Sequence, residues 1–307
     1  MSQMRRAVVV FSALPGTTRG IAWMIFATIF YAATYGVVRL LSTEFGVFQL
    51  VFFRSIIGLF LMLPWLIRGG VGQIKTPQPV TYAWRSTLNY GGMVFLIFGL
   101  STMQLQDVTG LMFTTPLFTV LFVTLFLREQ VGPRRAIALL VGFAGAMIII
   151  RPGFQELTWA ALGVLGTSSA YAVINVLTKT LARTDSSNTI VFYDFFLLSL
   201  LGIVPAIIYW SEVRLEHICW VAVMGICSSL ARQGVIRALA EGEASVVMPF
   251  NFLKLPFTVC IGFVWFAENP DLWTGIGAAV IFASTYYIAR HETVRKSDIT
   301  AKPSPPV

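Results

Sequence analysis

Six charged side chains fall within long apolar stretches, where a charge is expensive and requires a reason. They are Arg54, Arg85, Asp194, Arg232, Arg237 and Lys254. A charge at the centre of a bilayer costs about 2.5–3.5 kcal/mol on insertion scales, and such residues usually serve a function. Because five of the six are basic, a cavity that they lined would favour a ligand with a carboxylate or phosphate group. These residues therefore indicate that the protein binds a polar metabolite.

Lys254 is the first candidate for binding such a ligand. Helical rise places it roughly 15 Å into its apolar stretch, near the middle of a bilayer. Pro256 follows two residues later and removes one backbone hydrogen bond from the same helix. The structural alternative is that Lys254 pairs with a carboxylate or with the carbonyl groups freed near Pro256.

Helical spacing gathers further polar and aromatic residues beside these charges, since residues three or four apart share a face. Asn251 precedes Lys254 by three, and Asn89 follows Arg85 by four. The predicted substrate-binding set is Tyr35, Arg85, Asn89, Tyr90, Tyr171, Asn175, Arg232, Gln233, Asn251 and Lys254. For the tyrosines the alternative is ordinary packing, and for Arg232 it is an ion pair at an inner gate or extension to the membrane surface.

Arg54 and Asp194 are predicted to serve coupling or gating. They lie at similar depths in two separate apolar stretches. Asp194 is the one carboxylate among the buried charges, which makes it the candidate for proton coupling, although a plain ion pair with Arg232 is the interpretation that we favour. The alternative for Arg54 is a structural role, either reaching the membrane surface or bracing the fold.

Membrane-spanning helices must position these residues. The chain is 56% hydrophobic and 12% charged, whereas soluble domains carry about 25% charged residues. Apolar stretches of the length that spans a bilayer recur throughout. Ten spans are predicted, near residues 20–41, 47–67, 82–100, 107–127, 135–150, 158–178, 188–209, 217–239, 244–266 and 272–289. The fold class is therefore an all-α polytopic membrane protein.

The chain also repeats itself. The offset that separates Glu129 from Glu268 also separates residues 118–120 from residues 257–259, and both of these triplets read Phe-Thr-Val. Each copy holds five spans, an odd number, so the second copy enters the membrane from the opposite side. Such inverted repeats are common in secondary transporters, which bind substrate at the repeat interface. We expect Glu129 and Glu268 to fix the elbows of two helical hairpins.

Four segments follow from this organisation. They are a cytoplasmic N-terminal lead-in (1–19), a first repeat (20–151), a second repeat (158–290) and a disordered cytoplasmic tail (291–307). The run Ala7–Leu14 resembles the start of a signal peptide, but a full span follows it, so we favour a lead-in. With the N-terminus inside, inner loops and ends hold 14 Lys and Arg residues and outer loops hold 3. Both termini are therefore predicted to be cytoplasmic.

Other function classes find less support. The net charge of +8 follows the alternation of membrane loops, so we expect no nucleic-acid partner. Cys219, Cys227 and Cys260 lie in apolar runs and are interpreted as small apolar residues. We expect no metal and no cofactor, because no His, Cys and carboxylate cluster has ligand spacing. Nothing resembles a phosphate-binding loop that would imply ATP drive. The oligomeric state is left open between a monomer and a homodimer.

Longer motifs resemble the drug/metabolite transporter superfamily, EamA type. The first copy offers Thr115-Pro116-Leu117 through Arg128-Glu129, then Gly142-Phe-Ala-Gly145 and Arg151-Pro152-Gly153. The second copy offers Pro256 through Glu268, then Gly275-Ile-Gly277. The resemblance covers residues 20–290 and includes Arg54, which matches an arginine common in the second span of that family. It implies ten helices in two inverted five-helix repeats, with helices 1, 3, 6, 8 and 9 around a central cavity.

The stretch from Gly242 to Thr258 looks most like bacterial members that take up S-adenosylmethionine. The resemblance implies a secondary-active inner-membrane transporter of a small polar metabolite, amino-acid-like or S-adenosylmethionine-like, working by alternating access. A riboflavin or aromatic amino-acid carrier of the same superfamily is the alternative. A channel or a membrane-embedded enzyme is the alternative of another class.

Overall fold

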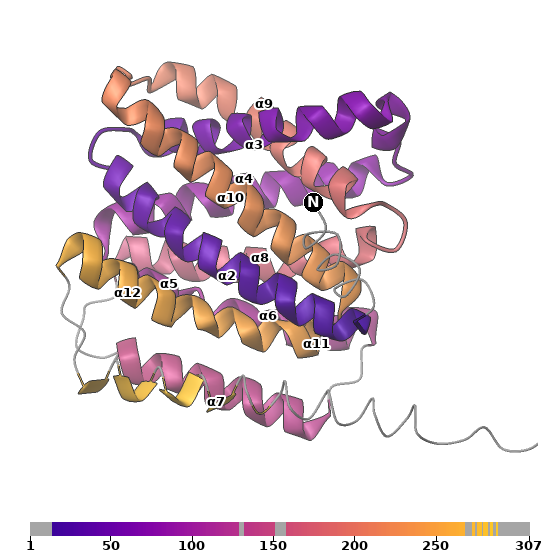
Figure 1. Ribbon diagram of the computed structural model, residues 1–307, viewed down its shortest axis with the longest axis vertical. Helices are drawn as coiled ribbons and strands as arrows, with labels where there is room; N and C mark the ends of the chain where they lie inside the picture. Colours follow the sequence, from indigo (N-terminus) through magenta and orange to yellow (C-terminus); the bar gives the residue numbers. More distant parts are fainter. Residues whose placement is uncertain are drawn as a thin grey trace, which may run out of the picture.

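The computed structural model describes residues 14–128, 132–150 and 158–267, together with 272–273, 275–277, 279–281, 283–284 and 287. Within these residues all regular structure is helical. Six long helices lie side by side in Figure 1: α2 (Gly16–Leu41), α3 (Val47–Gly69), α4 (Pro79–Thr102), α8 (Trp159–Leu181), α9 (Ser187–Ile208) and α10 (Leu215–Glu241). A short 3-10 helix, η1 (Val71–Ile74), connects α3 to α4. The all-α prediction is confirmed for the described chain.

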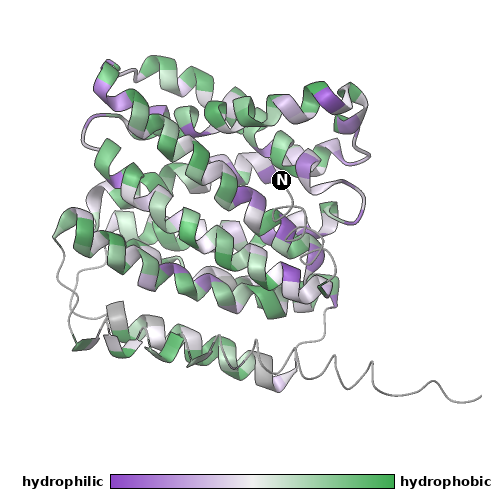
Figure 2. Ribbon diagram, viewed as in Figure 1, coloured by the Kyte–Doolittle hydropathy of each residue, from purple (hydrophilic) through white to green (hydrophobic). Residues whose placement is uncertain are grey.

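Six segments are long and apolar enough to cross a membrane. They are Gly16–Leu41, Val47–Gly69, Trp159–Leu181, Ser187–Ile208, Leu215–Glu241 and Ala244–Phe266. Much of the helical ribbon in Figure 2 has the colour of hydrophobic residues. Large apolar side chains such as Phe60, Phe126 and Ile207 are exposed. Contiguous apolar surface of this kind suits lipid rather than water. The chain is a polytopic membrane protein; that all ten predicted spans cross stays a prediction.

Two of the predicted spans are interrupted rather than continuous. The span predicted at 107–127 is divided into α5 (Leu105–Leu111) and α6 (Thr114–Leu127), because Pro116 offers no backbone N–H to the carbonyl of Met112. The span predicted at 244–266 consists of α11 (Ala244–Val247), the 3-10 helix η2 (Met248–Leu253) and α12 (Lys254–Phe266). Lys254 therefore begins a helix instead of lying midway along a regular one.

The interruptions recur at the spacing of the sequence repeat. Phe113 and Phe252, which correspond across the repeat, each lie at an interruption, and their rings meet edge to face at 5.1 Å. Arg128 and Ala267 also correspond across the repeat, and both adopt the left-handed conformation with φ of 53° at a helix end. Backbone conformation thus repeats along with sequence.

Glycines allow the closest helix packing. A Cβ atom at Gly234 of α10 would lie 2.9 Å from the carbonyl oxygen of Trp23 and 3.2 Å from Cα of Ala27, both in α2. α7 (Pro133–Ile150), at the bottom of Figure 1, packs equally closely on a later segment, since a Cβ atom at Gly145 would lie 3.0 Å from the carbonyl oxygen of Gly277. Only glycine permits these approaches.

Several predicted features lie outside the described residues. They include Glu129 and Glu268 of the elbows, residues 1–13 of the lead-in and the whole tail at 291–307. Helix α2 begins at Gly16, within the predicted lead-in, and the boundary between lead-in and membrane span stays a prediction. The threonines at 17 and 18 join the first turn of this helix.

Substituting Gly234 with valine should destabilise the protein by about 1–3 kcal/mol, because the added atoms meet the backbone of α2 and cannot be accommodated by a side-chain rotation. Gly166 in α8 is the matched control, since no atom lies within 4 Å of the position of its Cβ. Thermal denaturation of the purified protein in detergent should therefore show a lower midpoint for Gly234→Val than for Gly166→Val. Equal midpoints would contradict this account of the packing.

Candidate functional site

A cavity lies among the long helices and the interrupted segment at α11, η2 and α12. Its polar and charged lining consists of Tyr31, Tyr35, Arg54, Asn89, Thr115, Tyr171, Asn175, Asp194, Arg232, Asn251 and Lys254. About 780 Å³ of empty space lies among the lining side chains, part of it open to solvent, but only about 70 Å³ can hold the centres of water-sized molecules. The cavity is therefore narrow, and a bulky ligand requires the helices to move apart.

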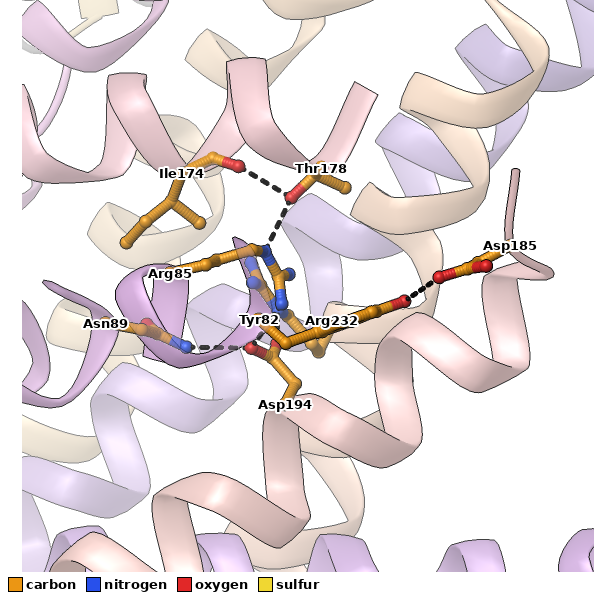
Figure 3. A network of polar contacts seen from close by, with 8 residues as sticks. All are labelled: Tyr82, Arg85, Asn89, Ile174, Thr178, Asp185, Asp194 and Arg232. Atoms are coloured by element: carbon orange, nitrogen blue, oxygen red, sulfur yellow. Dashed lines mark hydrogen bonds and ion pairs between the residues drawn. The ribbon is translucent and has the colours of Figure 1, made fainter. Parts of the chain in front are cut away.

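Asp194 on α9 is the centre of a buried network of charges (Figure 3). Its Oδ1 accepts hydrogen bonds from Nη1 of Arg85 at 2.9 Å and from Nδ2 of Asn89 at 3.1 Å, both from α4. Its Oδ2 pairs with Nε of Arg232 from α10. The ion pair expected between Asp194 and Arg232 is thus present, and Arg85 adds a second cation that the sequence did not assign to it.

The arginines around Asp194 have further donors. Nε of Arg85 donates to Oγ1 of Thr178 at 3.0 Å, and that hydroxyl donates to the carbonyl oxygen of Ile174 at 2.7 Å. Nη2 of Arg85 and Nη2 of Arg232 are buried, and neither has a hydrogen-bond partner among the residues that the structure describes. A single carboxylate therefore serves two guanidinium groups and does not use all of their N–H donors.

Lys254 lies apart from this network among aromatic rings. It is 4% exposed, and its Nζ donates to the hydroxyl of Tyr35 at 3.4 Å. The same nitrogen lies 5.0 Å from the ring centre of Tyr35, 5.8 Å from that of Phe113 and 6.0 Å from that of Tyr31. These ring faces favour a cation. The structure shows no carboxylate paired with Lys254 among the described residues.

Arg54 on α3 is also buried beside the cavity, with 7% of its surface exposed. No hydrogen bond or ion pair joins it to any described residue, and its Nε is enclosed without a partner. The alternatives predicted for Arg54, bracing the fold or reaching the membrane surface, stay predictions.

Most of the predicted residues line this one cavity, whatever their role. These are Tyr35, Asn89, Tyr171, Asn175, Arg232, Asn251 and Lys254 from the predicted binding set, together with Arg54 and Asp194. Three predicted positions do not line it. Arg85 lies behind Asp194 and is fully buried, Tyr90 packs against Gly202 of α9, and Gln233 lies outside the lining. One residue along a helix rotates a side chain by about 100°, which accounts for Tyr90 and Gln233.

Sequence reasoning missed part of the lining. Met112 and Thr115 both face the cavity, and they correspond across the repeat to Asn251 and Lys254. The repeat offset was the signal that would have identified them. Met24, Met93 and Met248 also line the cavity, and nothing in their spacing marked them.

Polar contacts close one end of the helix bundle near this network. Asp185, in the turn between α8 and α9, accepts hydrogen bonds at Oδ2 from the hydroxyl groups of Tyr82 at 2.8 Å and Thr76 at 2.7 Å (Figure 3 shows the first). Nε2 of Gln78 donates to Oγ1 of Thr184 at 3.0 Å. These contacts fasten the start of α4 to the α8–α9 turn.

The EamA-like transporter family matches the chain twice, over residues 18–151 and over residues 158–290. The chain belongs to this family. Arg85 lies in the first match, while Asp194 and Arg232 lie in the second. The buried network thus joins the two EamA-like segments. Membership makes the protein a membrane transporter of a small molecule rather than an enzyme.

Curated relatives of this EamA-like transporter carry different substrate names. An S-adenosylmethionine uptake transporter of Rickettsia bellii is 25% identical over 280 residues, covering 91% of this chain and 96% of the relative. A riboflavin transporter of Vibrio cholerae is 30% identical over 281 residues, covering 90% and 94%. The pseudopaline exporter CntI of Pseudomonas aeruginosa is 25% identical over 277 residues, covering 88% and 96%. The names agree on transport and differ in substrate.

A solved crystal structure shares the fold of this EamA-like transporter. The two chains superpose with a TM-score of 0.74 at 16% sequence identity, and the match covers 91% of this chain and 98% of the other. Fold is thus retained at low identity. Because so few residues are identical, the solved structure does not indicate which charges line the cavity of this chain.

Replacing Asp194 with asparagine should destabilise the protein by about 3–5 kcal/mol, because two buried guanidinium groups lose their shared counter-charge. Glu216→Gln is the matched control, since its carboxylate is 66% exposed beside Arg214 and exposed pairs contribute little. Thermal denaturation in detergent should separate the two variants clearly. Similar midpoints would show that the pairs with Arg85 and Arg232 do not stabilise the fold.

Proposed function

We propose that the protein is a secondary-active carrier that moves a small polar metabolite across a bacterial inner membrane by alternating access. The observation that carries this proposal is a cavity at membrane depth that both EamA-like segments line. Tyr35, Arg54 and Asn89 come from the first segment, and Asp194, Arg232 and Lys254 from the second. A site between two repeats is the arrangement that rocking of one repeat against the other requires.

An inverted arrangement of the two segments is part of the proposal. It is supported by the paired helix interruptions, the paired left-handed helix ends and the contact between Phe113 and Phe252. Interrupted helices near the midplane are typical of transporters, because unpaired backbone groups are tolerated only where they are buried in protein or line a cavity. We also propose that residues 20–151 and residues 158–290 form the two repeats.

Alternating access requires that polar contacts between the segments break and re-form. The pair between Arg85 and Asp194 and the bond between Tyr82 and Asp185 both cross from the first segment to the second. In the arrangement described, these contacts join α4 of the first segment to α9 and the α8–α9 turn of the second. We assign to Asp194 the role of an inner gate, held shut by Arg85 and Arg232, and retain proton coupling as the alternative.

The substrate that we propose is an amino-acid-like or S-adenosylmethionine-like metabolite. Basic groups in the cavity suit a carboxylate, and the rings of Tyr31, Tyr35 and Tyr171 suit an aromatic or nucleoside portion. A riboflavin carrier is a second candidate, favoured by the same tyrosines and by the relative from Vibrio cholerae. A continuous open pore would favour a channel, whereas the narrow cavity favours a carrier.

Substitution of Lys254 with alanine should abolish saturable exchange of carboxylated metabolites, because the cavity then lacks its ammonium donor. The measurement is counterflow of labelled amino acids and S-adenosylmethionine in proteoliposomes with equal amounts of protein. Lys75→Ala is the control, since Lys75 is exposed after η1. Unchanged exchange by Lys254→Ala would remove Lys254 from the site, and linear, non-saturable flux by the unaltered protein would indicate a channel.

Both termini should lie in the cytoplasm, because basic residues are concentrated in the loops on that side. A fluorescent protein fused after residue 307 should therefore fluoresce, and alkaline phosphatase fused at the same place should stay inactive. Fusions of the same two reporters in the α2–α3 turn at residues 42–46 should give the reverse pattern. Active phosphatase at the C-terminus would contradict the proposed orientation.

A further inference from the structure

Arg54 is a buried cation that forms no ion pair with any described carboxylate. The residue is 7% exposed, it lines the cavity, and it has no hydrogen-bond or ion-pair partner in the described part of the chain. A guanidinium group stays charged in proteins and carries five N–H donors. Removing such a group from water costs several kcal/mol unless a partner restores the lost interactions. The described residues supply no such partner.

The repeat indicates what is missing at this position. Arg54 and Asp194 are separated by the same interval as the first residues of the two family matches, 18 and 158. Both line the cavity. In the second segment the anion is fully matched, because Asp194 receives hydrogen bonds from Arg85, Asn89 and Arg232. In the first segment the corresponding position carries a cation, and no described anion forms a hydrogen bond or ion pair with it.

The wider charge balance of the site leads to the same result. Three arginines, Arg54, Arg85 and Arg232, and a single carboxylate, Asp194, are buried in the described chain. At least two positive charges are therefore unbalanced, before Lys254 is considered. Three buried guanidinium nitrogens, one from each arginine, lack a hydrogen-bond acceptor. An acidic ligand in the cavity would supply the charge, and it would supply acceptors to Arg54 and Arg232, which line the cavity.

We propose that Arg54 is the anchor for the acid group of the substrate, and that the carrier selects ligands with a net negative charge. This inference rests on the proposed function and narrows its substrate class. A carboxylate or phosphate accepts two parallel hydrogen bonds from a guanidinium group. Tyr35 and Tyr171, which line the same cavity as Arg54, flank the anchored acid. Of the two substrate classes proposed above, this inference retains the amino-acid-like acids and sets aside S-adenosylmethionine-like ligands, because a net positive charge is repelled by the same arginines.

A charge series on one aromatic ring tests the proposal. The probes are phenylpyruvate (carboxylate), phenyl phosphate (phosphate), phenylalanine (zwitterion) and phenylalaninamide (cation). Each is titrated against the full chain in detergent, and the rise of the melting temperature reports binding. Phenylpyruvate or phenyl phosphate should stabilise the unaltered protein most, and the stronger of the two identifies the acid. Stabilisation by neither acid, or equal stabilisation by phenylalaninamide, would overturn the proposal.

Variants of Arg54 then separate an anchor from a structural residue. Arg54→Gln should weaken binding of the preferred acid about 10- to 100-fold, the loss expected for a charged hydrogen bond, while Arg54→Lys should restore part of it. Arg68→Gln is the matched control, since Arg68 is exposed at the other end of the same helix. Without ligand, Arg54→Gln should melt at the same temperature as the unaltered protein or higher, because an unpaired buried charge has been removed.

Undiminished binding of the acid by Arg54→Gln would overturn the assignment. If the melting temperature without ligand also fell at this unchanged affinity, Arg54 would be a structural residue. The proposed function is tested separately by counterflow in proteoliposomes. Saturable exchange of a cationic or neutral metabolite would retain the carrier and refute the anionic class, whereas absence of any exchange would refute the carrier.

Discussion

Charge balance in a medium that solvates charge poorly is the constraint on which this structure depends. Among the described residues Asp194 is the one buried carboxylate, and two arginines share it. The arginines come from α4 and α10, so the network joins three helices and both family-matched segments. An anion alone at this depth would be prohibitively expensive, and so would either arginine. The three helices must therefore be held together for their buried charges to remain paired.

The helix packing and the interruptions place the remaining side chains around this network. Glycine contacts such as that of Gly234 with α2 bring the helix backbones close together. Side chains of the interrupted segments line the space that remains between the helices. The interruptions at Met112 and Phe113 and at η2 set Thr115 and Lys254 beside the cavity. Backbone that lacks regular hydrogen bonds is accommodated here because it adjoins polar groups rather than lipid. A narrow cavity with an excess of basic groups is the result.

Much of this arrangement was predictable, and the reasons differ from residue to residue. The depth of Lys254, Arg232 and Arg54 in apolar stretches identified them, because an ionisable group at that depth seldom lacks a function. An offset of 139 or 140 residues between matching residues indicated a repeat, and the family matches both segments. The sequence did not reveal that Arg85 faces Asp194 instead of the cavity, since the rotation of a helix depends on its neighbours. The extents of the interruptions were also missed, because a proline removes one hydrogen bond without determining how far the helix is disturbed.

The relatives' names span S-adenosylmethionine, riboflavin and pseudopaline, so family membership leaves the substrate of this chain open. We propose that selectivity in this chain comes from Arg54, at the position that corresponds to Asp194 across the repeat, and that an acidic substrate neutralises it. On this proposal the charges of the cavity are balanced only when the substrate is bound.

A structure determined experimentally with a bound aromatic acid would test that claim most directly. The account predicts that the acid oxygens lie about 2.7–2.9 Å from the guanidinium nitrogens of Arg54, with the ring among Tyr31, Tyr35 and Tyr171. An acid bound elsewhere in the cavity, with Arg54 still unpaired or turned toward lipid, would contradict it.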